Sequence, residues 1–339
     1  MEDPIYQFVP SLKVDTVFLN IIGCPEFTRL HGIKQAGITG LFAERSYSRY
    51  EHSVGVYFLL KYLGASLPQC IGGLLHDIYH TNFSHTIDEL FCGKNQESFH
   101  EKNKYVFFEK CCGNIKRILI ETFPEISYTN FLDGPIMFIT KNKSFGADML
   151  DYFMRDGFYE KIFTKEWVNL LVSKLSINDD RIVLNDFQMS KYFLEKTIYI
   201  NDHAYMSPLS RGQYCLFTYI LARAISNGVI QPEQIIYGFN TDEEIYRKIR
   251  ENCDTETMIQ IVRLENSTEF SFSCDNDKIW KKISVEITRK LRYLNPICPK
   301  NEFEYDIVSA NDPASTDLIK QKQLEYSKKE ELYVKEDNS

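Results

Sequence analysis

The sequence predicts a mainly α protein in which a helical bundle precedes a smaller C-terminal α+β lobe. Apolar side chains recur at helical spacing from His52 through Val56 and Leu59, which marks one face of a helix. After about residue 230 the pattern changes to short strand-like stretches. Hydrophobic residues make up 44% of the 339 positions, so the chain has enough apolar side chains to build a large core.

The first 45 residues are expected to be a lead-in with a short helix near 25–35, after which Gly37 and Gly40 break the chain. A helical pattern begins at Ser48, and a loop over 78–91 re-enters a short helix. The other expected helices cover residues 68–76, 100–122, 144–156, part of 166–180, and two segments over 187–227 that Pro208 separates.

Strands are expected later in the chain, where β-branched and aromatic residues form short runs. The tail after about Asp317 is rich in Lys and Glu and is expected to be solvated or a frayed helix. The expected strands cover residues 181–184, 259–264, 270–273 and 283–287. The expected domains are a lead-in at 1–45, a helical domain with the candidate site at 46–228, an α+β lobe at 229–310 and a charged tail at 311–339.

The charge balance argues against two classes of partner. A net charge of −8 gives no reason to expect broad nucleic-acid binding or an anionic membrane surface as partner, although one pocket can still be cationic. No uncharged apolar run has the length of a membrane span, and the acidic N-terminus is unlike a signal peptide. The nine cysteines form no CxxC pair, which favours reduced thiols in a soluble cytoplasmic or nuclear protein.

Four of the seven histidines lie between positions 76 and 100, and this concentration requires an explanation. His76 is followed by Asp77 at the end of the apolar stretch IGGLLHD. Imidazole and carboxylate groups bind divalent metals, and two such side chains at a helix end can turn toward one ion. His80 follows four residues after His76 and shares its face if the helix continues. Alone, such a dipeptide is far more often structural than metal-binding.

A later segment, DMLDYFMRD, places three polar side chains on one stripe of an expected helix. Asp148, Tyr152 and Asp156 follow one another at four-residue spacing. Because like charges at this spacing repel, the stripe invites a cation or a polar ligand group. Taken by itself, however, the stripe favours a solvated helix face with a packed tyrosine.

The order of these groups along the chain is more specific than any one of them. His52 lies upstream at the start of a helix, and Arg49 precedes it by three residues, where a guanidinium suits phosphate recognition. His52, the His76–Asp77 pair and Asp148 lie on separate helices, as expected for a metal site inside a helical bundle. A divalent metal in such a site lowers the pKa of water and polarises a phosphoryl oxygen.

Five segments in this order, PEFTRLHGIKQAG, SRYEHSVGV, LLHDIYHTNFSHTID, FHEK and DMLDYFMRD, resemble the HD-domain deoxynucleoside triphosphate triphosphohydrolases, the dNTPases that carry SAM and HD domains, and their bacterial relatives. The resemblance covers about residues 23–160 and continues more weakly through HAYMSP and KLRYLNP to about 310. It includes no SAM domain. It implies an HD-domain helical bundle and a divalent metal cofactor such as Mg, Mn, Fe or Zn, which the sequence alone does not distinguish.

The resemblance also implies roles for individual residues. It places the histidine–carboxylate pair of His85 and Asp88 near the scissile phosphate. It assigns the deoxyribose contacts to Tyr152 and Asp156, a sugar or base contact to Gln35, and packing on the sugar to Tyr205. The implied metal ligands are His52, His76, Asp77 and Asp148. The implied catalytic and phosphate-facing residues are Arg49, His80, His85, Asp88 and His100.

Three departures from the family pattern weaken the expected triphosphate clamp. Met149 stands where the family helix often has Lys. Thr197 aligns with a phosphate-gripping Arg, although Lys196 adjoins it. Gln35 is followed by Ala36, where a bulkier apolar residue is common. These changes leave the implied metal-binding and hydrolytic groups intact.

A further departure predicts that guanine nucleotides do not activate this chain. In the nucleotide-activated relatives an Asp, a Gln and an Arg near the PEFxRLR segment bind the activating guanine nucleotide, and here these positions are Gly23, Thr28 and His31. Without the matching hydrogen-bond partners, guanine recognition at that place is expected to be poor. Hydrolysis measured with and without GTP is expected to be the same, and a large GTP requirement would refute this prediction.

Three hypotheses about function follow. The first is metal-dependent hydrolysis of a dNTP to a deoxynucleoside and inorganic triphosphate by a homo-oligomer. The second keeps the site but changes the substrate to a nucleoside monophosphate or another phosphoester, as in an HD-type phosphatase or phosphodiesterase, and the missing Lys and Arg favour it. The third is a catalytically silent HD-fold binding protein, which the full set of metal-binding side chains argues against.

Overall fold

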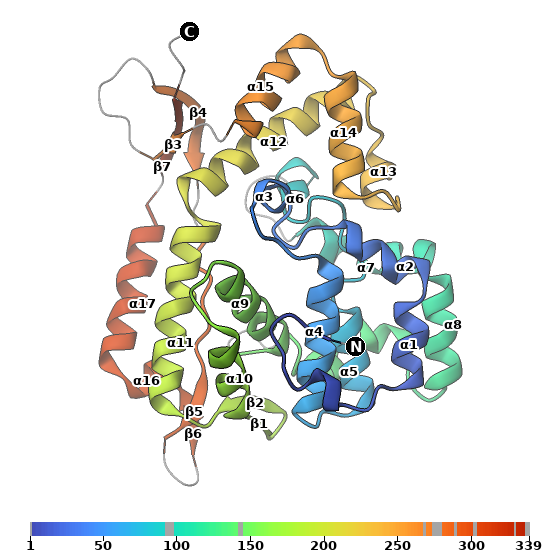
Figure 1. Cartoon of the computed structure of the whole chain (residues 1–339), viewed down its shortest axis with the longest axis vertical. Coiled ribbons are helices and arrows are strands. Elements are labelled where there is room, and N and C mark those ends of the chain that lie inside the picture. The colour runs from blue at the N-terminus through green and yellow to red at the C-terminus, as the bar shows by residue number, and fades with distance from the viewer. Residues whose placement is uncertain are drawn as a thin grey trace.

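The computed structural model describes residues 2–91, 98–141, 145–266, 269–272, 280–287, 290–300, 304–328 and 330–335. Within them the chain is mainly helical and carries three small antiparallel sheets (Figure 1). The predicted fold class, a helical bundle with a smaller C-terminal α+β lobe, is confirmed. None of the described helices combines the length and the apolar character that crossing a bilayer requires.

Helix α4 lies at the centre of the bundle and packs against both α5 and α9. Two glycines permit these close approaches. A Cβ atom on Gly73 of α5 would lie 2.4 Å from Cδ1 of Leu60 in α4, and one on Gly55 of α4 would lie 2.0 Å from Nη2 of Arg155 in α9. The three helices are α4 (Arg49–Tyr62), α5 (Leu67–Leu75) and α9 (Ala147–Tyr159).

The N-terminal lead-in is more helical than expected. The short helix predicted near 25–35 is α2 followed by a single 3₁₀ turn. Gly37 does interrupt the chain, with a φ of 58°, but Gly40 lies inside α3, so the expected break there is wrong. This region contains α1 (Thr16–Ile22), α2 (Pro25–Thr28), the 3₁₀ turn Arg29–Gly32 and α3 (Ile38–Phe42), after the 3₁₀ turn Val9–Ser11.

The middle of the chain differs from the prediction in two places. The helix expected over 100–122 is two helices that meet at Cys112, α7 and α8. The start predicted near Ser144 lies outside the described residues. Helix α9 continues to Tyr159, three residues beyond its predicted end at 156, and a Cβ atom on Gly157 would meet the ring of Phe163 at 2.1 Å. The elements are α6 (Thr86–Phe91), α7 (Phe99–Cys111), α8 (Gly113–Thr122) and the 3₁₀ turns Tyr128–Phe131 and Pro135–Met137.

The segment after α9 follows the prediction closely. A helix, a hairpin whose second strand is the expected one, and two helices separated before Pro208 are all present. Between the last two helices, the π-helical turn Asn201–Tyr205 redirects the chain toward the site. The elements are α10 (Lys165–Ser173), β1 (Leu175–Asn178), β2 (Arg181–Leu184), α11 (Phe187–Ile200) and α12 (Pro208–Ser226).

The strand expected over 259–264 is wrong, because these residues belong to helix α15. The side chain of Asp254 caps this helix by accepting the backbone N–H of Thr257 at 2.8 Å. Ile261 and Leu264 are buried at helical spacing, whereas Ile259 is half exposed. The three helices here, α13 (Pro232–Ile236), α14 (Asp242–Asn252) and α15 (Thr255–Glu265), form the upper part of the lobe in Figure 1.

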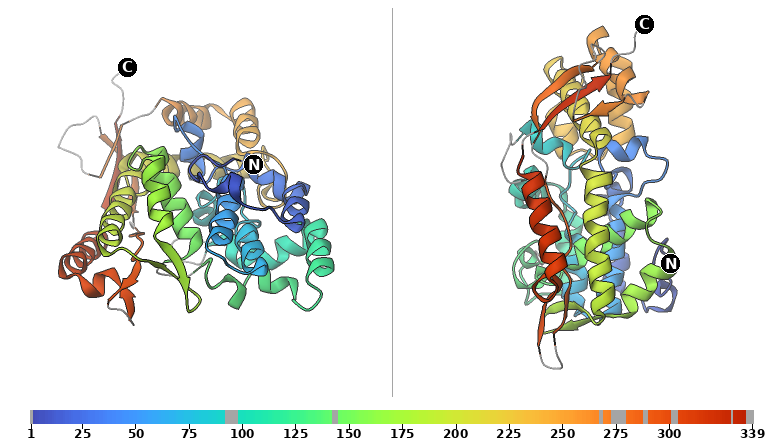
Figure 2. Two further views of the ribbon diagram at one scale, coloured as in Figure 1. Left: turned by 60° about the horizontal axis from the view of Figure 1, so that its bottom comes forward. Right: turned by 90° about the vertical axis from the view of Figure 1, so that its left-hand side faces the viewer.

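The charged tail is also more ordered than expected. Residues 313–326 form a full helix, α17, which runs beside α11 in both figures (Figures 1 and 2). Residues 330–335 form the central strand of the sheet β3–β7–β4, with Leu332 and Val334 buried. The division into domains remains a prediction. The late elements are β3 (Phe270–Ser271), β4 (Trp280–Ile287), β5 (Ile297–Pro299), β6 (Tyr305–Ile307), α16 (Val308–Asn311), α17 (Pro313–Tyr326) and β7 (Glu330–Lys335).

Candidate metal and phosphate site

A cavity of about 740 Å³ lies where α3, α4 and α9 meet the junction of α11 and α12. Residues from the turn after α5 and from the segment 290–292 complete its wall. Every candidate residue named from the sequence lines this cavity except His52 and Asp88. These two bond directly to lining residues, namely Asp148 and His85. The chain thus brings the candidates together around one space.

Three side chains from three helices converge at the floor of the cavity. His52 lies in the first turn of α4, His76 caps the C-terminus of α5, and Asp148 lies in the first turn of α9. Nε2 of His52 is 3.1 Å from Nε2 of His76 and 3.1 Å from Oδ1 of Asp148, and the distance from Nε2 of His76 to Oδ1 of Asp148 is 3.4 Å. One ion can contact all three atoms.

The hydrogen bonds of the two imidazoles indicate that the group fits a cation. Nδ1–H of His52 donates to Oδ2 of Asp151 at 2.7 Å, and Nδ1–H of His76 donates to the Gly73 carbonyl at 2.7 Å. Without a metal, burial lowers the pKa of His52, but the hydrogen bonds to Asp148 and Asp151 outweigh burial and raise that pKa to about 9. When the rings are neutral, each keeps its one proton on Nδ1, and both Nε2 atoms present lone pairs. Two lone pairs and a carboxylate oxygen facing one another repel unless a positive charge lies between them. The donor set therefore suits a divalent metal.

Asp77 lies at the edge of this group. Its Oδ1 is 3.6 Å from Nε2 of His76, and its other oxygen forms a buried ion pair with Nη1 of Arg49. Burial alone would raise the pKa of Asp77, but the Arg49 guanidinium and the neighbouring imidazoles hold that pKa well below its usual value. Asp77 is thus a carboxylate at neutral pH.

A buried network that the sequence analysis missed supports His52. Asp151 accepts hydrogen bonds from His52, from Nε of Arg155 at 2.8 Å and from the hydroxyl of Tyr6 at 2.7 Å. Arg155 also donates to Asp3 at 2.7 Å. All of these side chains are buried. Asp151 follows Asp148 by three residues, so the helical periodicity of DMLDYFMRD carried the only signal for it.

Three further imidazoles form the next part of the wall. The rings of His80 and His100 lie 3.7 Å apart, and each is 5.4 Å from the ring of His85. Burial lowers the pKa of all three, that of His100 to about 3. They are therefore neutral at pH 7. Nδ1–H of His85 donates to Asp88 at 2.9 Å, which leaves its Nε2 available.

His80 does not share a helix face with His76, because the helix on which that expectation depended does not continue. Helix α5 ends at Leu75, and His80 reaches Asp77 across a turn, at 3.3 Å. The chain then passes through Phe83 and Ser84, whose φ values of 57° and 49° are rare for residues with side chains.

The histidine-bearing turn is held by buried residues from distant segments. Arg29 donates to the carbonyls of Ile78 and His80, at 2.6 and 2.8 Å. Asp242, at the start of α14, accepts the backbone N–H of Phe83 and that of Lys34, both at 2.9 Å. Because these partners are fully or nearly fully buried, they can maintain the left-handed backbone before His85.

A Tyr–Asp–Tyr cluster, made of Tyr47, Asp156 and Tyr205, forms another part of the cavity wall. Asp156 accepts the hydroxyl of Tyr47 at 2.7 Å and that of Tyr205 on its other oxygen. Tyr152 lines the same wall, and the buried amide oxygen of Gln35 has no hydrogen-bond partner among the described residues. Tyr47 was missed by the sequence analysis, because nothing in its spacing links it to Asp156.

The buried state of Asp156 predicts a pH dependence of stability. Burial raises its pKa to about 6, against hydrogen bonds from Tyr205 and Tyr47 that lower it. An acid whose pKa is higher in the folded state is bound to more protons there, so its contribution to stability falls as pH rises from about 4 to about 6. The free energy of unfolding can be measured with urea for wild type and Asp156→Asn at several pH values. Between about pH 4 and about pH 6, the free energy of unfolding of wild type is expected to fall by about 2–3 kcal/mol relative to that of the variant. A pH-independent difference between the two would contradict the prediction.

The cations of the cavity differ in how they are balanced. Arg49 is paired with Asp77, and Lys141 donates to Glu101 at 2.8 Å and to the hydroxyl of Tyr79. Lys290 and Arg292 form no ion pair with a carboxylate among the residues that the structure describes. Neither was singled out from the sequence, although both lie in the segment KLRYLNP.

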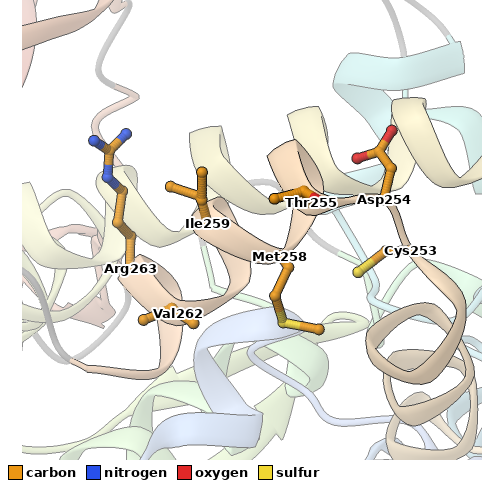
Figure 3. A pocket seen from close by; sticks show the side chains of 7 residues that line it. All are labelled: Cys253, Asp254, Thr255, Met258, Ile259, Val262 and Arg263. Atoms are coloured by element: carbon orange, nitrogen blue, oxygen red, sulfur yellow. The ribbon is translucent and has the colours of Figure 1, made fainter.

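A second hollow, on the surface of α15, lacks these features (Figure 3). Its wall is largely apolar, with Met258, Ile259 and Val262 in the middle. Its one carboxylate, Asp254, is engaged in capping α15 and in an ion pair with Arg223. No polar groups converge in it, so the candidate site is the larger cavity.

Known proteins share this domain and this fold. Residues 49–122 match the HD domain family model. The chain is 26% identical to the metal-dependent phosphohydrolase cns2 of Cordyceps militaris over 276 residues, which covers 78% of this chain and 77% of that protein. It is 36% identical over 108 residues to the deoxynucleoside triphosphate triphosphohydrolase SAMHD1 of Danio rerio, a match that covers 27% of this chain and 17% of SAMHD1.

The fold extends over the whole of a solved relative. The crystal structure of a phosphohydrolase from Bacteroides thetaiotaomicron superposes with a TM-score of 0.63 and covers 99% of both chains at 16% identity. Residues 49–122 thus match the HD domain, and over much of its length the chain is similar to a metal-dependent phosphohydrolase.

Proposed function

We propose that this chain hydrolyses deoxynucleoside triphosphates between the α-phosphorus and the 5′ oxygen, releasing a deoxynucleoside and inorganic triphosphate. The observation that carries the proposal is that one cavity holds a metal-binding group, three neutral imidazoles and a Tyr–Asp–Tyr cluster. The first two features suit phosphoryl chemistry. The third suits a sugar, because a carboxylate flanked by tyrosines can accept a hydroxyl between aromatic walls. The similarity to SAMHD1, a deoxynucleoside triphosphate triphosphohydrolase, adds support.

The proposed metal ligands are His52, His76, Asp77 and Asp148. The converging lone pairs of the first two, described above, support this assignment. When bound, a divalent cation such as Mg, Mn, Fe or Zn polarises a phosphoryl oxygen and makes nearby water more acidic. The protein contributes orientation, because Asp151 and the Gly73 carbonyl fix the two rings.

Proton transfer is assigned to His85, with Asp88 as its partner. The bond from Nδ1–H of His85 to Asp88 orients the ring and leaves Nε2 to face the phosphate. As a neutral base, Nε2 can orient the attacking water, and once protonated it can donate to the leaving 5′ oxygen. His80, His100 and Arg49 complete the phosphate-facing wall.

The sugar is assigned to the other end of the cavity. Asp156 and Tyr152 are proposed to hold the 3′-hydroxyl so tightly that a larger sugar is excluded, and Tyr205 to pack on the ring. The amide oxygen of Gln35 is buried without a partner, which costs free energy unless a ligand donates a hydrogen bond to it. A nucleotide with a donor at this place would satisfy it.

Product analysis tests this function. Metal-replete protein is incubated with a mixture of deoxynucleoside and ribonucleoside triphosphates, and the products are identified by mass spectrometry and ion chromatography. Equimolar deoxynucleoside and inorganic triphosphate are expected, with ribonucleotides unchanged. Stepwise release of orthophosphate, or release of pyrophosphate, would overturn the proposal. His76→Ala serves as the inactive control.

One observation favours an alternative substrate. Met149 lines the cavity where the family often has Lys, and Thr197 replaces an Arg, so a nucleoside monophosphate or another phosphoester is the second candidate. The same product analysis with dNMP as a second substrate distinguishes the two, because a monophosphatase releases orthophosphate from dNMP and leaves dNTP intact. Assembly into a homo-oligomer and a cytoplasmic or nuclear location remain predictions.

A further inference from the structure

The position at which the family carries a phosphate-gripping Arg has a different use in this chain. Thr197 in α11 is fully buried, and its hydroxyl oxygen accepts the backbone N–H of Leu294 at 3.0 Å. One turn later, Oδ1 of Asn201 accepts the backbone N–H of Arg292 at 2.9 Å. Thr197 and Asn201 thus hold residues 292–294 against the helical bundle.

This docking brings the Arg292 side chain to the wall of the cavity. Its charge acts on groups from three other elements. Burial lowers the pKa of His85, and the Arg292 guanidinium lowers it further. Burial raises the pKa of Tyr152 and of Tyr205, and the Arg292 guanidinium opposes this rise. The charge of Arg292 therefore acts on groups at both the proposed phosphate end and the proposed sugar end of the site.

Arg292 is accompanied by a second cation. The charge of Arg292 is the largest cause of the lowered pKa of Lys290, which means that the two cations lie close together. No carboxylate among the described residues is ion-paired with either of them. Asp88 opposes the lowered pKa of Lys290 without forming an ion pair with it. The two neighbouring cations still repel one another, and an anion placed between them removes that cost.

We propose that Arg292, assisted by Lys290, binds the phosphoryl groups beyond the scissile one, and thereby makes this enzyme prefer nucleoside polyphosphates to monophosphates. The inference rests on the proposed function, because it takes the site to be one for nucleotides. Planar guanidinium groups bind phosphate oxygens in pairs, and such charge-assisted bonds are roughly twice as strong as neutral ones. In this proposal, the segment 290–294 supplies the phosphate-binding cation that is absent from α11, where Thr197 aligns with the family Arg.

The first test compares two substrates with the same scissile bond. Hydrolysis of dNMP also cleaves the bond to the 5′ oxygen, but dNMP has no distal phosphates. In wild type, kcat/KM is expected to be at least ~10-fold higher for dNTP than for dNMP, and Arg292→Met is expected to reduce this ratio by ~10–100-fold. The change is expected mainly in KM for dNTP, with kcat/KM for dNMP altered by less than ~3-fold.

Two further variants keep this test interpretable. Arg247→Met, which removes an exposed cation of α14 outside the cavity, is expected to leave the ratio unchanged. Thr197→Val removes the acceptor of the Leu294 N–H and is expected to lower the ratio as Arg292→Met does, although the Arg292 side chain is still present. A wild-type preference for dNTP that persists in Arg292→Met would overturn the inference and leave the proposed function standing.

Binding of inorganic triphosphate gives a readout without turnover. In calorimetry with Mg²⁺ present, triphosphate is expected to bind wild type at least ~10-fold more tightly than orthophosphate. Arg292→Met is expected to weaken triphosphate binding by ~10–100-fold and orthophosphate binding by less than ~3-fold. Equal triphosphate affinity in wild type and variant overturns the inference, whether or not the protein hydrolyses dNTPs.

Discussion

Replacing Asp151 with alanine is expected to lower the free energy of unfolding by about 3–5 kcal/mol and to weaken metal binding by ~10–100-fold. The carboxylate is fully buried and accepts from Arg155, His52 and Tyr6. Its removal leaves Arg155 with Asp3 at 2.7 Å and a longer contact to Glu51 at 4.0 Å, and a buried charge that loses a partner is costly. It also frees the ring of His52 to rotate or to change tautomer. Urea denaturation and metal titration measure the two effects.

Asp148→Ala is the matched control for this prediction. Asp148 lies three residues earlier on the same helix, but its side chain is 26% exposed and bonds only at the cavity floor. Its loss is expected to abolish metal binding while changing the unfolding free energy of the metal-free protein by less than about 1 kcal/mol. If Asp151→Ala kept wild-type stability and metal content, the supporting network described above would have no role.

Replacing His85 with alanine is expected to lower kcat by ~10²–10⁴-fold without loss of metal. This ring has no contact with His52, His76 or Asp148 among the described residues. It bonds instead to Asp88 and packs against His80 and His100. Its loss therefore removes proton transfer and leaves the proposed ligands in place. The measurement is kcat on dNTP together with the metal content of the purified variant.

Two further variants define the meaning of that result. Asp88→Asn is expected to lower kcat less than His85→Ala does, because the ring remains but loses its charged partner. His31→Ala removes a ring that stacks on Tyr50, 3.5 Å away and outside the cavity, and is expected to leave kcat unchanged. A His85→Ala variant with wild-type kcat would move the proton-transfer role to another residue.

Much of the site could be predicted because its residues are few in kind and ordered along the chain. The His76–Asp77 pair, His52 upstream and Asp148 downstream belong to separate helices, and facing helices bring such groups together. Their chemistry is visible in the residue types themselves. The metal, the substrate and the role of each residue are not visible in this way, and they remain proposals.

The residues that were missed act through contacts that no local pattern encodes. Tyr47 meets Asp156 across more than a hundred residues, through a single hydroxyl. Arg292 reaches the cavity because its own backbone N–H and that of Leu294 donate to side chains of α11 and of the turn after it. Every residue except proline has such an N–H group. A side-chain pattern therefore has no means of identifying this segment as part of the site.

The errors in secondary structure have equally local causes. Ile259, Ile261 and Val262 are β-branched and mimic a strand, yet the cap at Asp254 and burial against α12 make them helical. Conversely, β7 alternates buried Leu332 and Val334 with exposed or half-buried neighbours, but Lys and Glu around it resemble a solvated tail. In both α15 and β7, tertiary contacts set the secondary structure that the local composition did not predict.

The way in which residue 292 is held has an evolutionary consequence. Because the main chain of this segment does the docking, a mutation that changes the side chain at 292 leaves the scaffold unaltered. On the proposed role of Arg292, a lineage can therefore exchange a guanidinium there for a carboxylate, an amide or a hydrocarbon in one step, and select for a different group beyond the scissile phosphate while the hydrolytic apparatus stays the same. Laboratory libraries that vary this single codon would sample new substrates at little risk to folding.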